Sequence, residues 1–208
     1  RSQSKGFLHF CYTPSMAAEA TLQPIKRFGM DGAIIFSDIL VVPHALGMNV
    51  WFEEGEGPKL TPIEDEKALQ ALSLSNLDAH LAPVYEALAL VKAQLGKETA
   101  LIGFAGAPWT LACYSVEGKG SKDFAKVRLL AQNNRLLFSQ LIELLSQGVI
   151  QHVGNQIKAG AEIIQLFDSW ALALSGLPKR TARGRMGGRG ESMCMAATVA
   201  GAAAGSLA

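Results

Sequence analysis

The chain has 208 residues, which favours one compact domain over two. Hydrophobic residues make up 49% and charged residues 18%, so the chain can bury a core and is not disordered throughout. The net charge of +1 argues against nucleic acid as a partner, and no apolar run is long enough to cross a membrane. Three cysteines without CxxC spacing favour a reducing compartment, and we expect a cytoplasmic protein.

The first elements along the chain are a helix and a buried strand. Thr13 as N-cap and Pro14 in the first turn predict a helix that ends at Gly29, with a kink or restart at Pro24. The unalternating apolar run 33–36 predicts a strand covered on both faces.

Helices and two further strands follow. The segment 63–96 predicts two helices, of which the second is capped by Asp78. The runs 100–104 and 163–167 predict buried strands. Between them we expect three helices: one that opens at Ser121, an amphipathic one over the leucines of 136–145, and a last one over 149–159.

This alternation of strands and helices predicts an α/β fold with a parallel sheet. The strings GFAGAP and EGKGSK do not fit a phosphate-binding loop, so a nucleotide-binding sheet is disfavoured. A (β/α)8 TIM barrel fits better, and about three parallel strands would make it incomplete.

In parallel α/β folds the chemistry lies just beyond the carboxyl ends of the strands. Asp38 follows the first strand and would be a desolvated carboxylate in need of a partner; a helix cap or a loop salt bridge is the alternative. Tyr114 follows the second strand and Ser169 the third; a satisfied core hydroxyl and a helix cap are their alternatives. We expect Asp168 to be structural, and the nearby Trp109 and Trp170 to be wall or core.

The four histidines share no metal-binding spacing, and we expect them not to gather and the chain to hold no metal; they are His9, His44, His80 and His152. No nucleophile elbow or Cys/His dyad can be identified.

Several strings resemble the uroporphyrinogen decarboxylase family in the right order and spacing. They are TLQPIKRFGMDGAIIFSDILVVPHALGM, FEEGEGPKL, LIGFAGAPWTLACYSVEGKGSKDF and QIKAGAEIIQLFDSWA. The resemblance covers about residues 7–175. It implies a TIM barrel, usually a homodimer, that removes the carboxyl groups of four acetate side chains from uroporphyrinogen III without a metal or organic cofactor.

The resemblance also implies roles for five residues. Asp38 matches the central catalytic aspartate, and Tyr114 the tyrosine beside it. Ser169 matches a Ser/Thr that contacts a substrate carboxylate. Phe36 and Phe167 match apolar residues of the cleft. These residues are the expected catalytic and substrate-binding set, and the expected partner is a small tetrapyrrole.

The sequence departs from the family at both ends. A segment of the form RQAGRYLPEY and a late histidine are absent, so we expect an N-terminal half with impaired activity. We expect a partial barrel over 1–176 and a disordered Gly/Ala-rich tail over 177–208. The alternatives are an inactive product, a subunit that pairs with an intact copy, or a zinc-dependent corrinoid methyltransferase of the related barrel family.

Overall fold

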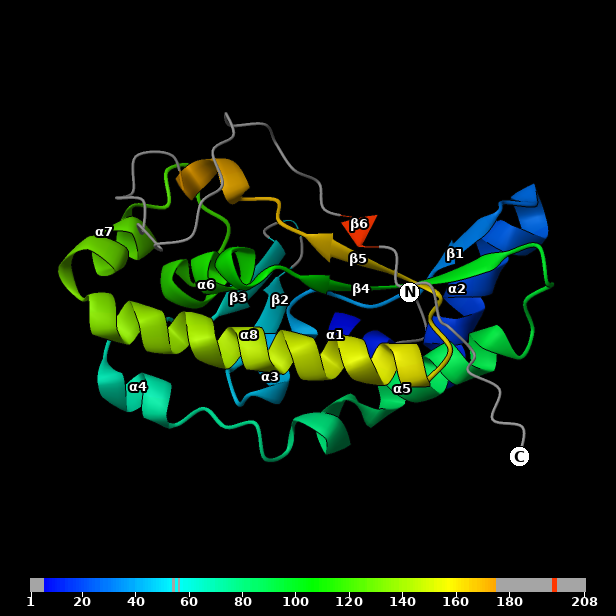
Figure 1. The fold of residues 1–208 in the computed structure, drawn as a ribbon, viewed down its shortest axis with the longest axis horizontal. Helices are drawn as coiled ribbons and strands as arrows, with labels where there is room; N and C mark the ends of the chain where they lie inside the picture. Colours follow the sequence, from blue (N-terminus) through cyan, green and yellow to red (C-terminus); the bar gives the residue numbers. More distant parts are fainter. Residues whose placement is uncertain (1–5, 54, 56, 175–195, 198–208) are drawn as a thin grey trace, which may run out of the picture.

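The fold is built on a sheet of three parallel strands with helices between them (Figure 1). The computed structural model describes residues 6–53, 55, 57–174 and 196–197. The three strands are β1 (Gly32–Ile34), β4 (Ala100–Gly106) and β5 (Ile163–Phe167), in the order β1-β4-β5. All three lie where apolar runs predicted strands, which confirms the predicted α/β class.

The remaining elements surround this sheet. Before β4 they are α1 (Phe7–Cys11), α2 (Pro14–Phe28), α3 (Val41–Ala45), a hairpin of β2 (Val50–Glu53) and β3 (Gly57–Leu60), α4 (Glu66–Gln70) and α5 (Leu77–Lys92). After β4 they are α6 (Pro108–Glu117), α7 (Ala125–Asn133), α8 (Arg135–Lys158), and the 3-10 turn η1 (Ala171–Leu174) after β5.

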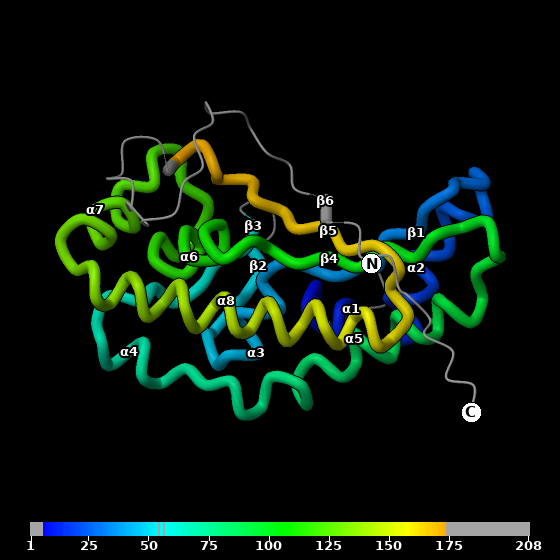
Figure 2. The backbone as a smooth tube through the Cα atoms, viewed as in Figure 1, coloured from blue at the N-terminus to red at the C-terminus, as the bar shows by residue number. Residues whose placement is uncertain are grey.

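Helices cover one face of the sheet. The long helix α8 and α5 pack against β4, and α2 packs against β1 and α5 (Figure 2). Residues of β4 alternate accordingly: Leu101 and Ala105 are buried on the helical side, whereas Phe104 on the opposite side is partly exposed. Ile34 and Phe167 are 46% and 37% exposed. The face of the sheet opposite the helices is therefore apolar and uncovered among the described residues.

A side chain from α8 replaces strand pairing at the end of β1. The Gln156 Nε2 donates to the Phe104 carbonyl at 2.8 Å, and its Oε1 accepts from the Phe104 N–H at 2.9 Å. Ile35 N–H donates to the Ile102 carbonyl, so the main-chain groups of Ile102 and Phe104 point toward β1. Because β1 ends at Ile34, Phe104 has no strand neighbour on that side, and the buried amide satisfies both of its groups.

Several predicted elements differ from the structure. The helix α2 runs through Pro24 without restarting. The two helices expected over 136–145 and 149–159 form one helix, α8. Gly148 does not break it, because the lack of a side chain there lets α8 pack closely against Val42 and Leu77. An added Cβ would lie 3.2 Å from the Val42 side chain. Asp78 lies in the first turn of α5 rather than at its cap, which is Asn76. The β2–β3 hairpin and helix α6 were not predicted.

The tail is described only at β6 (Ala196–Ala197), a two-residue strand antiparallel to β5. The predicted disorder of 177–208 otherwise falls outside the described residues, and the domain boundary at 176 stays a prediction. Across the part of the chain that the structure describes, no helix combines the length and apolar character that crossing a membrane requires.

Candidate active site

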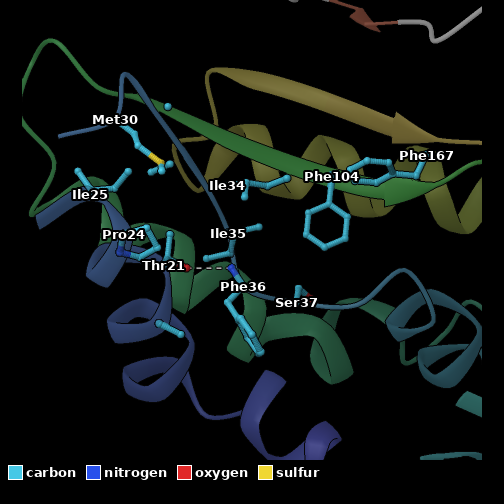
Figure 3. A pocket seen from close by; sticks show the side chains of 13 residues that line it. Thr21, Pro24, Ile25, Met30, Ile34, Ile35, Phe36, Ser37, Phe104 and Phe167 are labelled. Carbon is cyan, nitrogen blue, oxygen red and sulfur yellow. Dashed lines mark hydrogen bonds between the residues drawn. The ribbon is translucent and has the colours of Figure 1, made fainter. Parts of the chain in front are cut away.

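The candidate site begins where β1 leaves the sheet. Beyond β1 the chain is held by a side chain of α2: the Phe36 N–H donates to the Thr21 hydroxyl at 2.8 Å, and that hydroxyl donates to the Ala17 carbonyl at 2.8 Å (Figure 3). The next residue, Ser37, has a buried hydroxyl without a hydrogen-bond partner among the described residues. Asp38 follows it, at the carboxyl end of the strand as predicted.

Asp38 is partly desolvated and only partly paired. Its Oδ1 accepts the Leu40 N–H at 2.8 Å, which closes a turn just before α3. Burial raises the pKa of the Asp38 carboxyl above its usual range, and the Leu40 hydrogen bond opposes this shift. Among the described residues no cationic side chain pairs with Asp38, so the salt-bridge alternative fails there. Asp38 is not the N-cap of α3 either, because that position is Leu40; its Oδ1 serves the turn before the helix.

Tyr114 lies on α6, within electrostatic reach of Asp38. Burial raises the pKa of Tyr114, and the negative charge of Asp38 raises it further. Pro108 at the first turn and Gly118 in the left-handed region, with φ of 77°, delimit this helix. At neutral pH the phenol is protonated, and its hydroxyl can donate a hydrogen bond beside the carboxylate.

Phe36 and Phe167 line one apolar cavity of about 580 Å³ against the uncovered face of the sheet (Figure 3). Phe104 also lines it, with its ring centroid 5.5 Å from that of Phe167. The Phe36 ring packs against Phe10 of α1, with centroids 4.7 Å apart. Both predicted apolar residues therefore share one cavity, and Ser37 is also among its lining residues.

Ser169 lines a second cavity of about 450 Å³, on the side of α7. The charged residues that line the same cavity are Lys122, Asp123 and Arg128. The predicted site residues are thus distributed over three places: Asp38 with Tyr114 in electrostatic reach, one apolar cavity, and one cavity with charged side chains.

The residues expected to be structural or part of the wall belong to one hydrogen-bonded network, and Trp170 also lines the second cavity. The Thr110 hydroxyl donates to Asp168 Oδ1 at 2.7 Å and accepts the Trp170 N–H at 3.2 Å. Trp109 is 6% exposed, and its indole N–H donates to the Trp170 carbonyl at 2.7 Å. This network fixes the loop after β5 against α6.

Two residues within electrostatic reach of Asp38, Cys11 and Tyr12, were not predicted from the sequence. Burial raises the pKa of the Cys11 thiol to about 12, and the charge of Asp38 adds to that shift. Burial also raises the pKa of the Tyr12 hydroxyl, and Cys11 and Asp38 raise it further. Both come from α1 and its end, whose place beside Asp38 depends on tertiary packing that no local pattern contains.

The expectation that the histidines do not gather is wrong. The His44 Nδ1 lies 3.1 Å from the His80 Nε2 and 2.9 Å from the Tyr12 hydroxyl. The two histidines are 36 residues apart in the sequence, so spacing could not show it. The packing of α3 against α5 brings them together.

A parallel α/β sheet with a desolvated carboxylate and a phenol beyond the carboxyl ends of its strands matches the arrangement of sites in the TIM-barrel class. A methyltransferase from Methanosarcina mazei has a similar fold, with a TM-score of 0.59 at 15% identity over 77% of this chain and 47% of that chain. This likeness supports the fold alone.

The family model for uroporphyrinogen decarboxylase (URO-D) matches residues 1–177. A uroporphyrinogen decarboxylase of Roseobacter denitrificans is 48% identical over 177 residues, which are 85% of this chain and 52% of that protein. One of Sphingopyxis alaskensis is 50% identical over 175 residues, 84% of this chain and 51% of that protein. The chain belongs to the uroporphyrinogen decarboxylase family and spans about half the length of these relatives.

Proposed function

We propose that this chain carries one part of the active site of a lyase that decarboxylates the acetate side chains of uroporphyrinogen III to give coproporphyrinogen III. Family membership supports the reaction. The observation that carries the site is the Asp38 carboxylate, which lies desolvated within electrostatic reach of Tyr114 with no cationic partner among the described residues. We place the enzyme in the cytoplasm and expect a homodimer when the barrel is complete.

In the proposed reaction the substrate supplies its own electron sink. Protonation of a pyrrole carbon makes the ring a cation, and the bond to the carboxyl carbon then breaks, so that its electron pair neutralises the ring. Carbon dioxide leaves from the ionised acetate, protonation of the remaining methylene carbon gives a methyl group, and loss of the proton from the pyrrole carbon restores the aromatic ring. Four such events convert four acetates to methyls.

Asp38 has the properties this reaction needs. A fixed carboxylate in a site poor in water stabilises a developing cation more strongly than solvent does, by about 3–4 kcal/mol for a preorganised group. The pyrrole N–H groups of a folded macrocycle would point at this carboxylate. The Tyr114 hydroxyl, held protonated, would hydrogen-bond a carboxylate of the substrate or Asp38 itself.

The remaining predicted residues fit binding roles. Phe36 and Phe167 would contact pyrrole rings through the apolar cavity. Ser169 would donate to a substrate carboxylate in the second cavity, where the charged residues Lys122 and Arg128 outnumber Asp123.

The test uses this chain alone and a completed chain in which the Roseobacter denitrificans relative supplies the segments absent here. Turnover of uroporphyrinogen is followed anaerobically, and the oxidised porphyrins are separated by carboxylate number. We expect products with seven to four carboxylates from the completed chain and none above a no-protein control from this chain alone. A folded completed chain without turnover would favour the alternatives, an inactive product or a non-catalytic subunit.

Asp38→Asn in the completed chain tests the site itself. It keeps the shape and removes the charge, and we expect kcat/KM to fall on the order of 10² to 10³-fold. The matched control is Asp31→Asn, an exposed aspartate just before β1, which should stay within about twofold of the parent. If Asp38→Asn retains most of the activity, Asp38 is not the catalytic group.

A further inference from the structure

Trp170 adjoins two of the three places over which the predicted site residues are distributed. It lies between β5 and η1, and it lines the second cavity together with Ser169. Its ring centroid is 6.2 Å from that of Tyr114 on α6 and 4.9 Å from that of Phe124. The indole is therefore packed between the second cavity and the phenol that lies within electrostatic reach of Asp38.

The main chain of Trp170 is held on both sides by α6. Its N–H donates to the Thr110 hydroxyl at 3.2 Å, and its carbonyl accepts the Trp109 indole N–H at 2.7 Å. The Thr110 hydroxyl is itself fixed, because it donates to Asp168 Oδ1 at 2.7 Å. The indole is thus held beside Tyr114 by contacts within the chain, and no ligand is needed to place it there.

The indole N–H of Trp170 is the polar group that this packing leaves unsatisfied. It is buried, and it forms no full hydrogen bond among the described residues, which costs free energy. It nevertheless acts on Tyr114: burial and the charge of Asp38 raise the pKa of that phenol, whereas hydrogen bonding from the Trp170 side chain lowers it. The indole N–H therefore faces the Tyr114 oxygen at a distance longer than that of a full hydrogen bond.

We propose that Trp170 is a positioning residue, which directs the hydroxyl hydrogen of Tyr114 toward a carboxylate; this inference rests on the proposed function. An indole N–H only donates, so it takes a lone pair of the phenol oxygen and never accepts the phenol hydrogen. That hydrogen then points away from Trp170 and is available to Asp38 or to a substrate carboxylate. Once it is donated, the phenol oxygen becomes a better acceptor, and its contact with the indole tightens.

The contact can be tested without activity, by nuclear magnetic resonance of the full chain with isotope-labelled tryptophan. The chain has three tryptophans, so three indole N–H signals are expected; they are Trp51, Trp109 and Trp170. Tyr114→Phe keeps the ring and removes the acceptor, and it should move the Trp170 signal upfield while the Trp51 signal stays in place. The matched control is Tyr85→Phe, which removes a part-buried phenol hydroxyl on α5. If Tyr114→Phe moves the Trp170 signal no more than Tyr85→Phe does, the proposal is overturned.

Kinetics of the completed chain test the positioning role. Trp170→Phe keeps an aromatic ring and removes the N–H, and kcat/KM should fall about five- to tenfold. Because the indole acts through Tyr114, the double variant should stay within about twofold of Tyr114→Phe alone. Phe124→Leu is the packing control: it changes the ring beside the indole and leaves the N–H, so its effect should multiply with that of Tyr114→Phe. Losses from Trp170→Phe and Tyr114→Phe that multiply in the same way would overturn the proposal.

The two measurements separate this inference from the proposed function. A folded completed chain without turnover counts against the proposed function, and the Trp170 signal still decides whether the indole contacts the phenol. Turnover together with an unmoved Trp170 signal overturns the inference and leaves the proposed function standing. If Trp170→Phe does not fold, the Tyr114→Phe spectrum decides the inference, because that variant leaves Trp170 in place.

Discussion

Replacing Gln156 by leucine should be among the most destabilising single changes in the chain. Gln156 is fully buried, and its amide forms both hydrogen bonds to the main chain of Phe104, at 2.8 and 2.9 Å. Leucine keeps much of the volume and removes both bonds. The Phe104 N–H and carbonyl would then lack a protein partner on the side where β1 has already ended.

The magnitude follows from two unsatisfied groups. Each buried, unpaired main-chain group costs about 1–3 kcal/mol, and the half-buried position of Phe104 places the sum near the lower part of the range, about 2–4 kcal/mol. At about 2–4 °C per kcal/mol for a chain of this size, the melting temperature should fall by roughly 5–15 °C.

Pulse proteolysis in urea measures this change, because it reports unfolding in dilute samples where aggregation is slow. The control is Gln147→Leu on the same helix, where the exposed amide donates only to Glu143 at 2.8 Å. That pair should contribute about 0.3–0.5 kcal/mol. If Gln156→Leu costs no more than Gln147→Leu, the amide does not act as a substitute for strand pairing.

Three further predictions concern pH, chemistry and association. Burial lowers the pKa of His152 to about 4, so below the ordinary histidine pKa of about 6.5 the unfolded chain binds more protons than the folded chain. The free energy of unfolding should therefore fall by about 2 kcal/mol from pH 7 to pH 5. Urea unfolding at both pH values measures this loss, and His152→Gln should lack it. Tyr114→Phe in the completed enzyme should reduce transition-state stabilisation, measured from kcat/KM, by about 1.5–3 kcal/mol, which is less than the loss in Asp38→Asn. Because burial raises the pKa of Asp38, the acid limb of the kcat/KM profile should lie above the usual aspartate range. An acid limb near pH 4 would contradict this. The isolated chain should aggregate with rising concentration in light scattering, because no described residue covers the outer edge of β1 or the apolar face with Ile34 and Phe167. A sharp, reversible melt of a monomer would argue against it.

The strands could be predicted because they depend on local signals: apolar runs without alternation identified all three parallel strands. The rule that chemistry follows strand ends made Asp38 and Tyr114 candidates, and their roles stay predictions. Helix α6 had such signals too, with Pro108 in its first turn and Gly118 at its end, and they were overlooked in a stretch that was examined for side-chain chemistry.

The features that the sequence did not predict depend on tertiary contacts. A break at Gly148 is reasonable from helix propensity, but the missing Cβ there lets α3 and α5 approach α8, and packing offsets the propensity cost. The meeting of His44 and His80 depends on how α3 lies against α5, and the position of Cys11 beside Asp38 on how α1 packs. No spacing within one segment encodes these contacts.

The Thr21 hydroxyl makes α2 a mechanical support of the site. This atom accepts the Phe36 N–H and donates to the Ala17 carbonyl of its own helix, and Phe36 is two residues from Asp38. A sliding or tilting of α2 would therefore be transmitted toward the carboxylate through this hydrogen bond, in addition to the backbone that joins Asp38 to β1. A ligand or partner that displaces α2 would therefore shift the Asp38 carboxylate without contacting it.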